Sequence, residues 1–182
     1  MNLAHEKENS ITIDPIDIHS LEALREIGIS CFVETFAEIN TAENMEKYLR
    51  ESFSIEKLSA ELSHPDSRFF IALEGTIVIG YLKVNEGAAQ TEQKLEHSLE
   101  IERIYVLKDY HGKRVGQLLM DKALSEARAG KFERVWLGVW ENNHRAIRFY
   151  EKNGFETFDT HLFHLGNDVQ TDLLMKLELK EA

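Results

Sequence analysis

The sequence predicts an α+β fold in which a mixed sheet carries helices on both of its faces. Two hairpin signals indicate antiparallel strands: Glu74-Gly75 separates two apolar runs, and Gly166-Asn167-Asp168 separates the last two. Between the strand-like runs lie stretches whose apolar residues recur every three or four positions, which is typical of amphipathic helices. Hairpins combined with strand-helix alternation give a sheet of mixed direction.

Each element follows from local signals. Asp17 and Thr41 can cap helices, and Asn153-Gly154 ends one. The polar stretch Glu86–His97 is expected to be a loop. The expected strands are Ile11–Ile13, Phe69–Leu73, Thr76–Val84, Leu99–Val106, Val135–Val139, Phe155–Leu165 and Thr171–Leu179. The expected helices run from Ile18 to about Thr35, from Thr41, over Ile55–Leu62, over Val115–Ala129 and over Asn143–Lys152. Apolar and polar residues alternate in the last strand, so one face of it should be buried.

Length and composition fit one domain over residues 1–182, with residues 1–10 flexible. The polar N-terminus lacks the apolar stretch of a secretion signal, and no run of 18 apolar residues could span a membrane. Cys31 is the only cysteine, so no internal disulfide can form. We therefore expect a cytoplasmic protein in which Cys31 is a buried helix residue rather than a nucleophile.

The net charge is −11, from 21 basic and 32 acidic residues. An excess of negative charge opposes nucleic-acid binding, which needs a basic surface. It suits a small cationic partner, because acidic clefts concentrate cations. Solubility alone explains the charge equally well.

The segment LEIERIYVLKDYHGKRVGQLLM has the order of a pyrophosphate site: a strand, a glycine-containing loop and a helix. Unpaired backbone N–H groups at a helix start receive phosphate oxygens. Gly112 and Gly116 let a ligand approach the backbone, and Lys113 and Arg114 add positive charge. A plain strand-to-helix turn explains this segment alone equally well.

A second segment, WLGVWENNHRAIRFYEKNGFE, changes that balance. Asn143, Ala146, Tyr150 and Gly154-Phe155 have the spacing N-x-x-A-x-x-x-Y-x-x-x-G-F. Together the two segments resemble, in the same order, the cofactor motifs of the GCN5-related N-acetyltransferase (GNAT) superfamily.

The loop departs from the family pattern Q/R-x-x-G-x-G/A at two positions. Gly116 matches the last glycine, whereas His111 and Arg114 differ. The departure at Arg114 matters little to binding through backbone N–H groups if that residue keeps a helical φ. The role of His111 stays open.

Further segments, among them ENMEKYL, GYLKVN, AQTE and QTDLLM, resemble the PaiA type of spermidine/spermine N-acetyltransferase. The resemblance implies a mostly antiparallel seven-stranded sheet that splays between strands four and five. Acetyl-coenzyme A would lie in the gap as co-substrate, with no metal. The implied cofactor-binding residues are Ile104, Tyr105, Val106, His111, Gly112, Lys113, Arg114, Val115, Gly116, Gln117 and Asn143.

The expected catalytic residues are Glu100, Glu102 and Tyr150. An alkylammonium with a pKa near ~10.4 must lose a proton before it attacks, and a carboxylate can take it. Glu100 and Glu102 are two apart on one strand, so they share a face. One would be the base and the other would help to bind the substrate. The resemblance implies that Tyr150 protonates the departing thiolate.

Two further pairs of residues are weak candidates for a functional site. His161 and His164 lie three apart in a strand, on opposite faces, with no further ligand for a metal. Trp136 and Trp140 are more consistent with packing than with base stacking.

The expected acceptor is a small cationic amine, and the resemblance favours polyamines. The enzyme is expected to be a monomer or homodimer. It is expected to bind neither nucleic acid nor membrane. Another small amine or a protein amine is the alternative acceptor. A regulator that binds acetyl-coenzyme A without turnover is the alternative from a different class.

Overall fold

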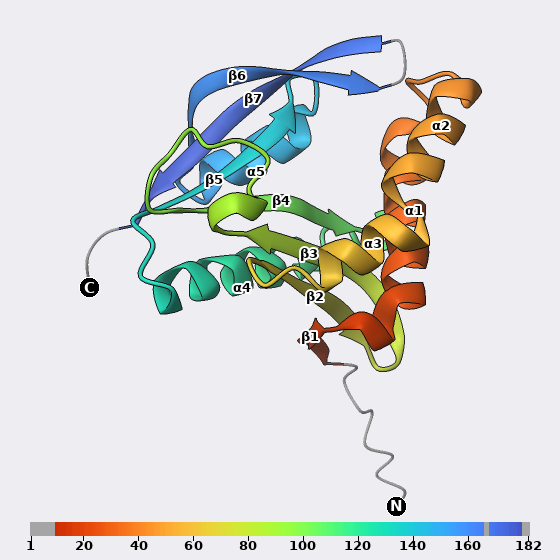
Figure 1. Cartoon of the computed structure of the whole chain (residues 1–182), viewed down its shortest axis with the longest axis horizontal. Helices are drawn as coiled ribbons and strands as arrows, with labels where there is room; N and C mark the ends of the chain where they lie inside the picture. The colour runs from red at the N-terminus through yellow and green to blue at the C-terminus, as the bar shows by residue number, and fades with distance from the viewer. Residues whose placement is uncertain (1–9, 166–167, 180–182) are drawn as a thin grey trace, which may run out of the picture.

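The computed structural model describes residues 10–165 and 168–179 (Figure 1). The expectation that residues 1–10 are flexible therefore falls almost wholly outside the described residues, as does the turn at 166–167. The strands are β1 (Ile11–Ile16), β2 (Ser67–Glu74), β3 (Ile77–Asn85), β4 (Ser98–Val106), β5 (Arg134–Trp140), β6 (Glu156–Leu165) and β7 (Asp168–Glu178). The helices are α1 (Leu21–Phe36), α2 (Ala42–Ser52), α3 (Ile55–Leu62), α4 (Val115–Ala129) and α5 (His144–Lys152), with 3-10 turns η1 (Ile18–Ser20), η2 (Gly87–Ala89) and η3 (Lys108–Tyr110).

All seven strands form one sheet in the order β1-β2-β3-β4-β5-β7-β6. Only β4 and β5 are parallel, so the predicted mixed, mostly antiparallel sheet is confirmed. These two strands pair only over Ser98–Glu100 and Arg134–Trp136. Beyond Glu100 they separate, with β1–β4 on one side of the opening and β5–β7 on the other (Figure 1). The sheet is therefore forked where the sequence predicts a splay.

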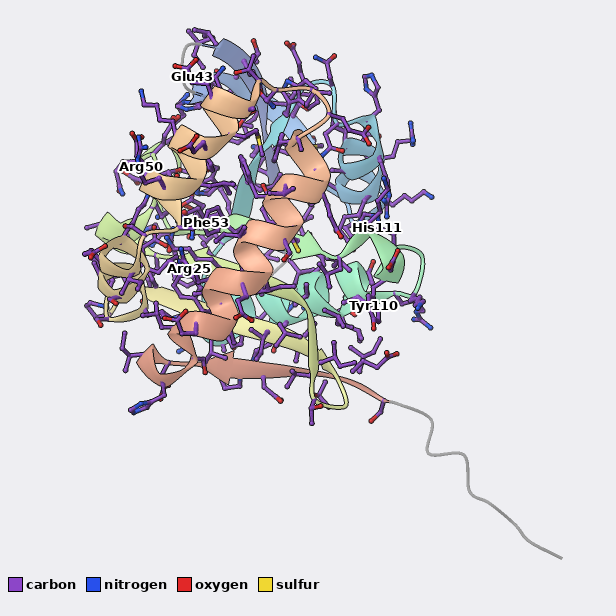
Figure 2. The ribbon with its side chains drawn as sticks, turned by 90° about the vertical axis from the view of Figure 1, so that its right-hand side faces the viewer. Arg25, Glu43, Arg50, Phe53, Tyr110 and His111 are labelled. Carbon is purple, nitrogen blue, oxygen red and sulfur yellow. The ribbon has the colours of Figure 1, made fainter. Side chains whose placement is uncertain are left out.

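Helices cover both faces of the sheet, as predicted. Helices α1, α2 and α3 pack on one face over a core that includes Leu24, Phe32 and Leu58. Helix α4 and Tyr150 of α5 pack on the opposite face over a second core. In Figure 2, α1 crosses the first face with α2 beside it, and Arg25 Nε donates to the Phe53 carbonyl at 3.0 Å. This bond ties α1 to the turn that follows α2.

The first predicted helix is interrupted. Asp17 caps the short turn η1 by accepting from the His19 N–H at 2.9 Å, rather than capping α1 itself. Ser20, with φ −96° and ψ 11°, separates this turn from α1. Thr41 caps α2 as predicted, because its hydroxyl accepts from the Asn44 N–H at 3.2 Å.

Strand β4 contains a bulge that the alternation of its side chains does not predict. Lys83 pairs with Arg103 and Val84 pairs with Ile101, so Glu102 is an extra residue without a partner in β3. Simple alternation would place Arg103 on the face opposite to Glu102. The bulge instead lets the two side chains form an ion pair of 3.0 Å.

The face of the last strand that the alternation predicted to be buried is buried, and Leu174 on the other face is buried as well. Leu174 is as buried as Met175, at 2% and 1% exposed. Met175 belongs to the core under α4 and α5, whereas Leu174 lies beside Gly138 on the other face. Asp172, Lys176 and Glu178 on that second face are half-buried or exposed, so the predicted alternation holds apart from Leu174.

Candidate active site

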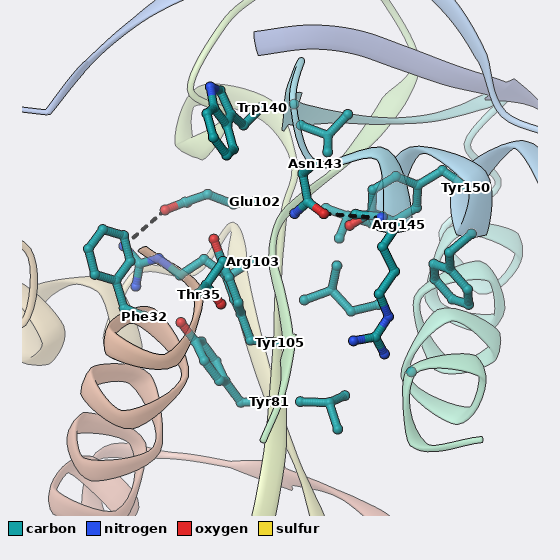
Figure 3. A pocket seen from close by; sticks show the side chains of 18 of the residues that line it. Phe32, Thr35, Tyr81, Glu102, Arg103, Tyr105, Trp140, Asn143, Arg145 and Tyr150 are labelled. Carbon is teal, nitrogen blue, oxygen red and sulfur yellow. Dashed lines mark hydrogen bonds and ion pairs between the residues drawn. The ribbon is translucent and has the colours of Figure 1, made fainter. Parts of the chain in front are cut away.

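The fork in the sheet contains a cavity of about 810 Å³. Its walls come from both arms of the fork, from α1, and from the N-terminal ends of α4 and α5. In Figure 3, Phe32, Tyr81 and Tyr105 lie on the α1 side of the strands. Asn143, Arg145 and Tyr150, also labelled there, lie on the α5 side. The cavity therefore reaches through the sheet, and two ligands can meet in it from opposite faces.

Beyond Glu100, the edge of β4 that faces the fork is not paired with β5. The Val106 carbonyl points into the fork, since it lies 2.8 Å from His111 Nε2. The next residue points the other way, because the Leu107 N–H donates to Ile79 at 3.0 Å. With a repeat of two residues, Ile104 faces the fork like Val106. An extended ligand with amide groups can pair with this edge as an added strand.

The loop before α4 turns its backbone sharply. Gly112 has φ +82° and Arg114, directly before the helix, has φ +66°. The expected helical φ of Arg114 is therefore wrong, because the chain enters α4 through a left-handed residue. Successive backbone N–H groups in such a turn form a concave binding site for anions. A Cβ placed on Gly116 would meet only Phe149, at 3.9 Å, so the helix start is open to a ligand.

His111 has a contact that the sequence did not predict. Its Nε2 lies 2.8 Å from the Val106 carbonyl and its Nδ1 contacts the Arg145 guanidinium. Burial, opposed by the Val106 contact and aided by Arg145, lowers the pKa of His111. A neutral ring that donates from Nε2 and accepts at Nδ1 satisfies both contacts. Arg145 lines the cavity and adds a positive charge beside the loop that precedes α4.

Two residues of α5 face the same space. Asn143 caps the helix, with its Oδ1 accepting from the Ala146 N–H at 3.2 Å, which leaves its amide nitrogen for a ligand (Figure 3). Tyr150 is 7% exposed, and its ring packs against Phe149 and Phe155. Within residues 10–165 and 168–179 nothing hydrogen-bonds the Tyr150 hydroxyl. Burial raises its pKa, so the phenol keeps its proton.

Glu100 lies at the base of the fork and is 2% exposed. Its carboxylate accepts from the Thr91 N–H at 2.9 Å, from the Thr91 hydroxyl and from Asn85 Nδ2 at 3.1 Å. Burial raises the pKa of Glu100 and these donors oppose the rise, with a net increase. A carboxyl group with a raised pKa is well suited to exchange protons near neutral pH.

Glu102 shares the face of Glu100, as predicted, but its carboxylate is already paired. It lies 2.6 Å from Lys83 and 3.0 Å from Arg103, and Asn85 donates to it at 2.5 Å. Burial alone would raise the pKa of Glu102, but Arg103 and Lys83 outweigh burial and hold it below the usual value. Glu61 of α3 completes the network through two bonds from Arg103, of 2.8 and 3.0 Å.

Sequence reasoning missed the groups that hold Glu100. The stretch Glu86–His97 is irregular apart from η2, as expected, but it is anchored across the fork. Gln90 Oε1 accepts from Trp136 Nε1 at 2.6 Å and from the Ser98 hydroxyl at 3.1 Å, and Thr91 follows it. The only available signal was the polarity of this stretch beside a strand that carries two glutamates.

Other predictions concern residues with no catalytic or binding role expected from the sequence. Cys31 is buried, at 1% exposed, and Trp136 is equally buried, in line with packing roles. His161 contacts Glu92, while the His164 side chain lies outside the described residues. In the part of the chain that the structure describes, no group of three or more His, Cys, Asp or Glu residues could hold a metal ion. No helix in the same part is long and apolar enough to cross a membrane.

The sequence pattern of the acetyltransferase (GNAT) family matches residues 21–155. The chain belongs to this family. It is an acetyl-coenzyme A-dependent N-acetyltransferase, as the two motifs predicted.

Similar proteins agree with the assignment. An uncharacterized N-acetyltransferase of Lactobacillus delbrueckii subsp. lactis is 38% identical over 84% of this acetyltransferase and 88% of its own length. Spermidine N(1)-acetyltransferase of Thermoplasma acidophilum is 29% identical over 83% of the chain and 91% of its own length. The crystal structure of the PaiA N-acetyltransferase of Thermoplasma acidophilum in complex with coenzyme A superimposes with a TM-score of 0.78 and 28% identity, covering 93% and 99% of the two chains.

Proposed function

We propose that this enzyme transfers the acetyl group of acetyl-coenzyme A to a primary amine of a polyamine such as spermidine or spermine, by direct attack in a ternary complex. The observation that carries the proposal is the cavity through the forked sheet, with Glu100 on one face and the Tyr150 hydroxyl on the other. Such an arrangement lets a base and an acid act on one reaction from opposite sides.

The cofactor side of the cavity has the groups that a coenzyme A thioester needs. Backbone groups of Ile104 and Val106 would pair with its amides, and the amide nitrogen of Asn143 would add a hydrogen bond. The loop before α4 and the start of α4 would receive the pyrophosphate, with Arg114 and Arg145 lining the cavity nearby. When bound, acetyl-coenzyme A supplies an activated acyl group.

The chain's own residues would then handle charge and protons. Glu100 would take a proton from the ammonium group, because it is the strand glutamate without a cationic partner among the described residues. Backbone N–H groups of β4 in the fork would stabilise negative charge on the carbonyl oxygen. Tyr150 would give its proton to the departing sulfur, since its phenol is protonated and lines the cavity. Glu102 would position Asn85, which also binds Glu100.

A polyamine acceptor is supported by charge and by kinship. The net charge of −11 favours cations. The Thermoplasma relative named for spermidine acetylation covers most of this chain. A single, buried cysteine suits the reducing cytoplasm, where we place the enzyme as a monomer or homodimer.

The test is a steady-state assay of coenzyme A release with spermidine, spermine, matched monoamines and a lysine peptide. We expect the polyamines to have the highest kcat/KM at low salt. Equal efficiency with a monoamine would refute the polyamine assignment, and coenzyme A binding without turnover on any amine would indicate a regulator. Gly116→Trp fills the helix start and should abolish coenzyme A binding in calorimetry, whereas unchanged affinity would remove the loop from the cofactor site.

A further inference from the structure

Among the residues that the structure describes, five carboxylates line the cavity, and four of them have partners within the protein. Glu100 and Glu102 are held as described above. Glu34 accepts from the Lys108 N–H at 2.7 Å, and Glu92 pairs with Lys94 at 3.2 Å and contacts His161. The fifth is Asp172 of β7. Among the described residues, Asp172 has no hydrogen bond and no ion pair.

Asp172 lies on the same face of the sheet as Glu100. Glu100 is level with Trp136 in β5, and side chains two and four positions further along β5 point to the same side. The fourth position is Trp140, which faces Asp172 across β5 and β7 and lies at the upper edge of the cavity in Figure 3. Asp172 therefore belongs to the arm of the fork opposite to Glu102.

Gly138 has no side chain to fill the space between the carboxylates of Glu100 and Asp172. A Cβ placed on Gly138 would lie 3.7 Å from Asp172 Oδ2, so the carboxylate reaches over Gly138. Gly138 is two residues beyond the level of Glu100, roughly 6–7 Å along the strand and one strand across. That separation is within reach of a chain with two ammonium groups joined by three or four methylenes.

The groups around Asp172 do not neutralise it. His161 faces it from β6, but the imidazole Nδ1 contacts Glu92. Glu141, which follows β5, adds negative charge. Burial, opposed by His161 and aided by Glu141, raises the pKa of Asp172 to about 6. A carboxylate in this state gains from a cation supplied by a ligand.

We propose that Asp172 binds the second ammonium group of a diamine or polyamine acceptor while Glu100 accepts the proton of the first. The inference rests on the proposed amine acetylation. It assigns the preference for substrates with two ammonium groups to Asp172. Gly138 keeps the path between the two groups free. Asp172 is thus a specificity residue and takes no part in proton transfer.

The test compares Asp172→Asn with the wild type on 1,4-diaminobutane and butylamine, which differ only in the second amine. We expect the variant to lose about tenfold to a hundredfold in kcat/KM for the diamine, as for a lost charge-assisted hydrogen bond, and to keep its kcat/KM for butylamine. Glu141→Gln is the matched control, because it removes a nearby negative charge that does not line the cavity. This control should leave kcat/KM nearly unchanged for both the diamine and butylamine.

A second variant guards against a folding effect at position 172. Gly138→Ala places a methyl group at ordinary contact distances of 3.6 Å from Leu174 and 3.7 Å from Asp172, so it should fold. It should raise the KM of the diamine more than that of butylamine, and thermal melts of each variant check the fold. A wild type that acetylates no amine refutes the proposed function and this inference with it. A wild-type preference for diamines that survives in Asp172→Asn, or an equal loss on both substrates, overturns the inference alone.

Discussion

The Glu102 carboxylate lies 2.6 Å from the Lys83 ammonium, a group that is only 5% exposed. Together with Arg103, Lys83 neutralises Glu102, although Glu102 lines the same cavity as Glu100. The two strand glutamates look equivalent in the sequence but have opposite surroundings. Glu100 has neutral donors and a raised pKa, and Glu102 has cationic partners and a lowered pKa. We therefore expect different results when each is replaced by glutamine.

Glu100→Gln should lower kcat by about 10²–10⁴-fold, because a general base is lost while the shape is kept. In the wild type, kcat/KM should rise with pH through the pKa of Glu100, which lies above the ordinary value of ~4.3. In the variant this rise should disappear and leave only the rise from the amine itself, at higher pH. A variant with the wild-type pH profile would show that Glu100 is not the base.

Glu102→Gln should act mainly on stability. Lys83 keeps Glu61 at 3.1 Å but loses its nearer partner, so the free energy of unfolding should fall by about 1–3 kcal/mol at neutral pH. The lowered pKa means that Glu102 stabilises the fold above the ordinary carboxyl pKa, and this contribution is lost as pH falls through the lowered pKa. The difference between variant and wild type in denaturant unfolding should therefore shrink in acid. A raised KM for spermidine at unchanged stability would contradict this expectation.

Thr91→Val should shift the ionisation of Glu100 to higher pH without removing the base. The substitution keeps the shape and the backbone N–H bond of 2.9 Å but removes the hydroxyl that donates to Glu100. Because that donor favours the ionised carboxylate, its loss should raise the pKa of Glu100 further and move the rise of kcat/KM to higher pH. Thr91→Ser keeps a hydroxyl and should restore the wild-type profile. If both variants behave alike, Thr91 has only a packing role.

Tyr150→Phe should reduce kcat by about 10²–10⁴-fold and leave the dissociation constant of coenzyme A unchanged in calorimetry. The hydroxyl has no hydrogen-bond partner within residues 10–165 and 168–179, so its removal should cost little stability. Tyr105→Phe is the matched control, because Tyr105 lines the cavity on the other face of the sheet and stacks on Tyr81. Equal effects of the two substitutions on kcat would argue against Tyr150 as the proton donor.

Arg114→Gly should stabilise the protein by about 1 kcal/mol. A side chain at φ +66° costs about 1–2 kcal/mol, and the greater freedom of glycine in the unfolded chain offsets part of the gain. Arg114→Ala loses the same charge but keeps the strain, so it isolates the backbone effect. In thermal unfolding the glycine variant should have a higher Tm than the alanine variant. Calorimetry should show tighter coenzyme A binding for the glycine variant than for the alanine variant. The reverse order would contradict the role given to the left-handed backbone.

The sequence by itself determined most of the secondary structure and predicted the residues that we propose for the cofactor side of the site. Helix α3 and helix α4 begin and end where their periodicity predicts, because their apolar faces are local signals. The spacing from Asn143 to Tyr150 was equally local, since both residues belong to one helical segment. The family resemblance then supplied the splay of the sheet, which periodicity alone does not contain.

Only the tertiary structure decided what surrounds each carboxylate. The bulge at Glu102 brought Arg103 to the same face, and β3 delivered Lys83 to the same point. Thr91, from an irregular stretch, met Glu100 because Gln90 is fixed to Trp136 across the fork. Its register in β7 left Asp172 without a hydrogen-bond or ion-pair partner among the described residues. These differences depend on contacts between segments far apart in the chain, and the charge and pKa of a side chain follow from such contacts rather than from its residue type.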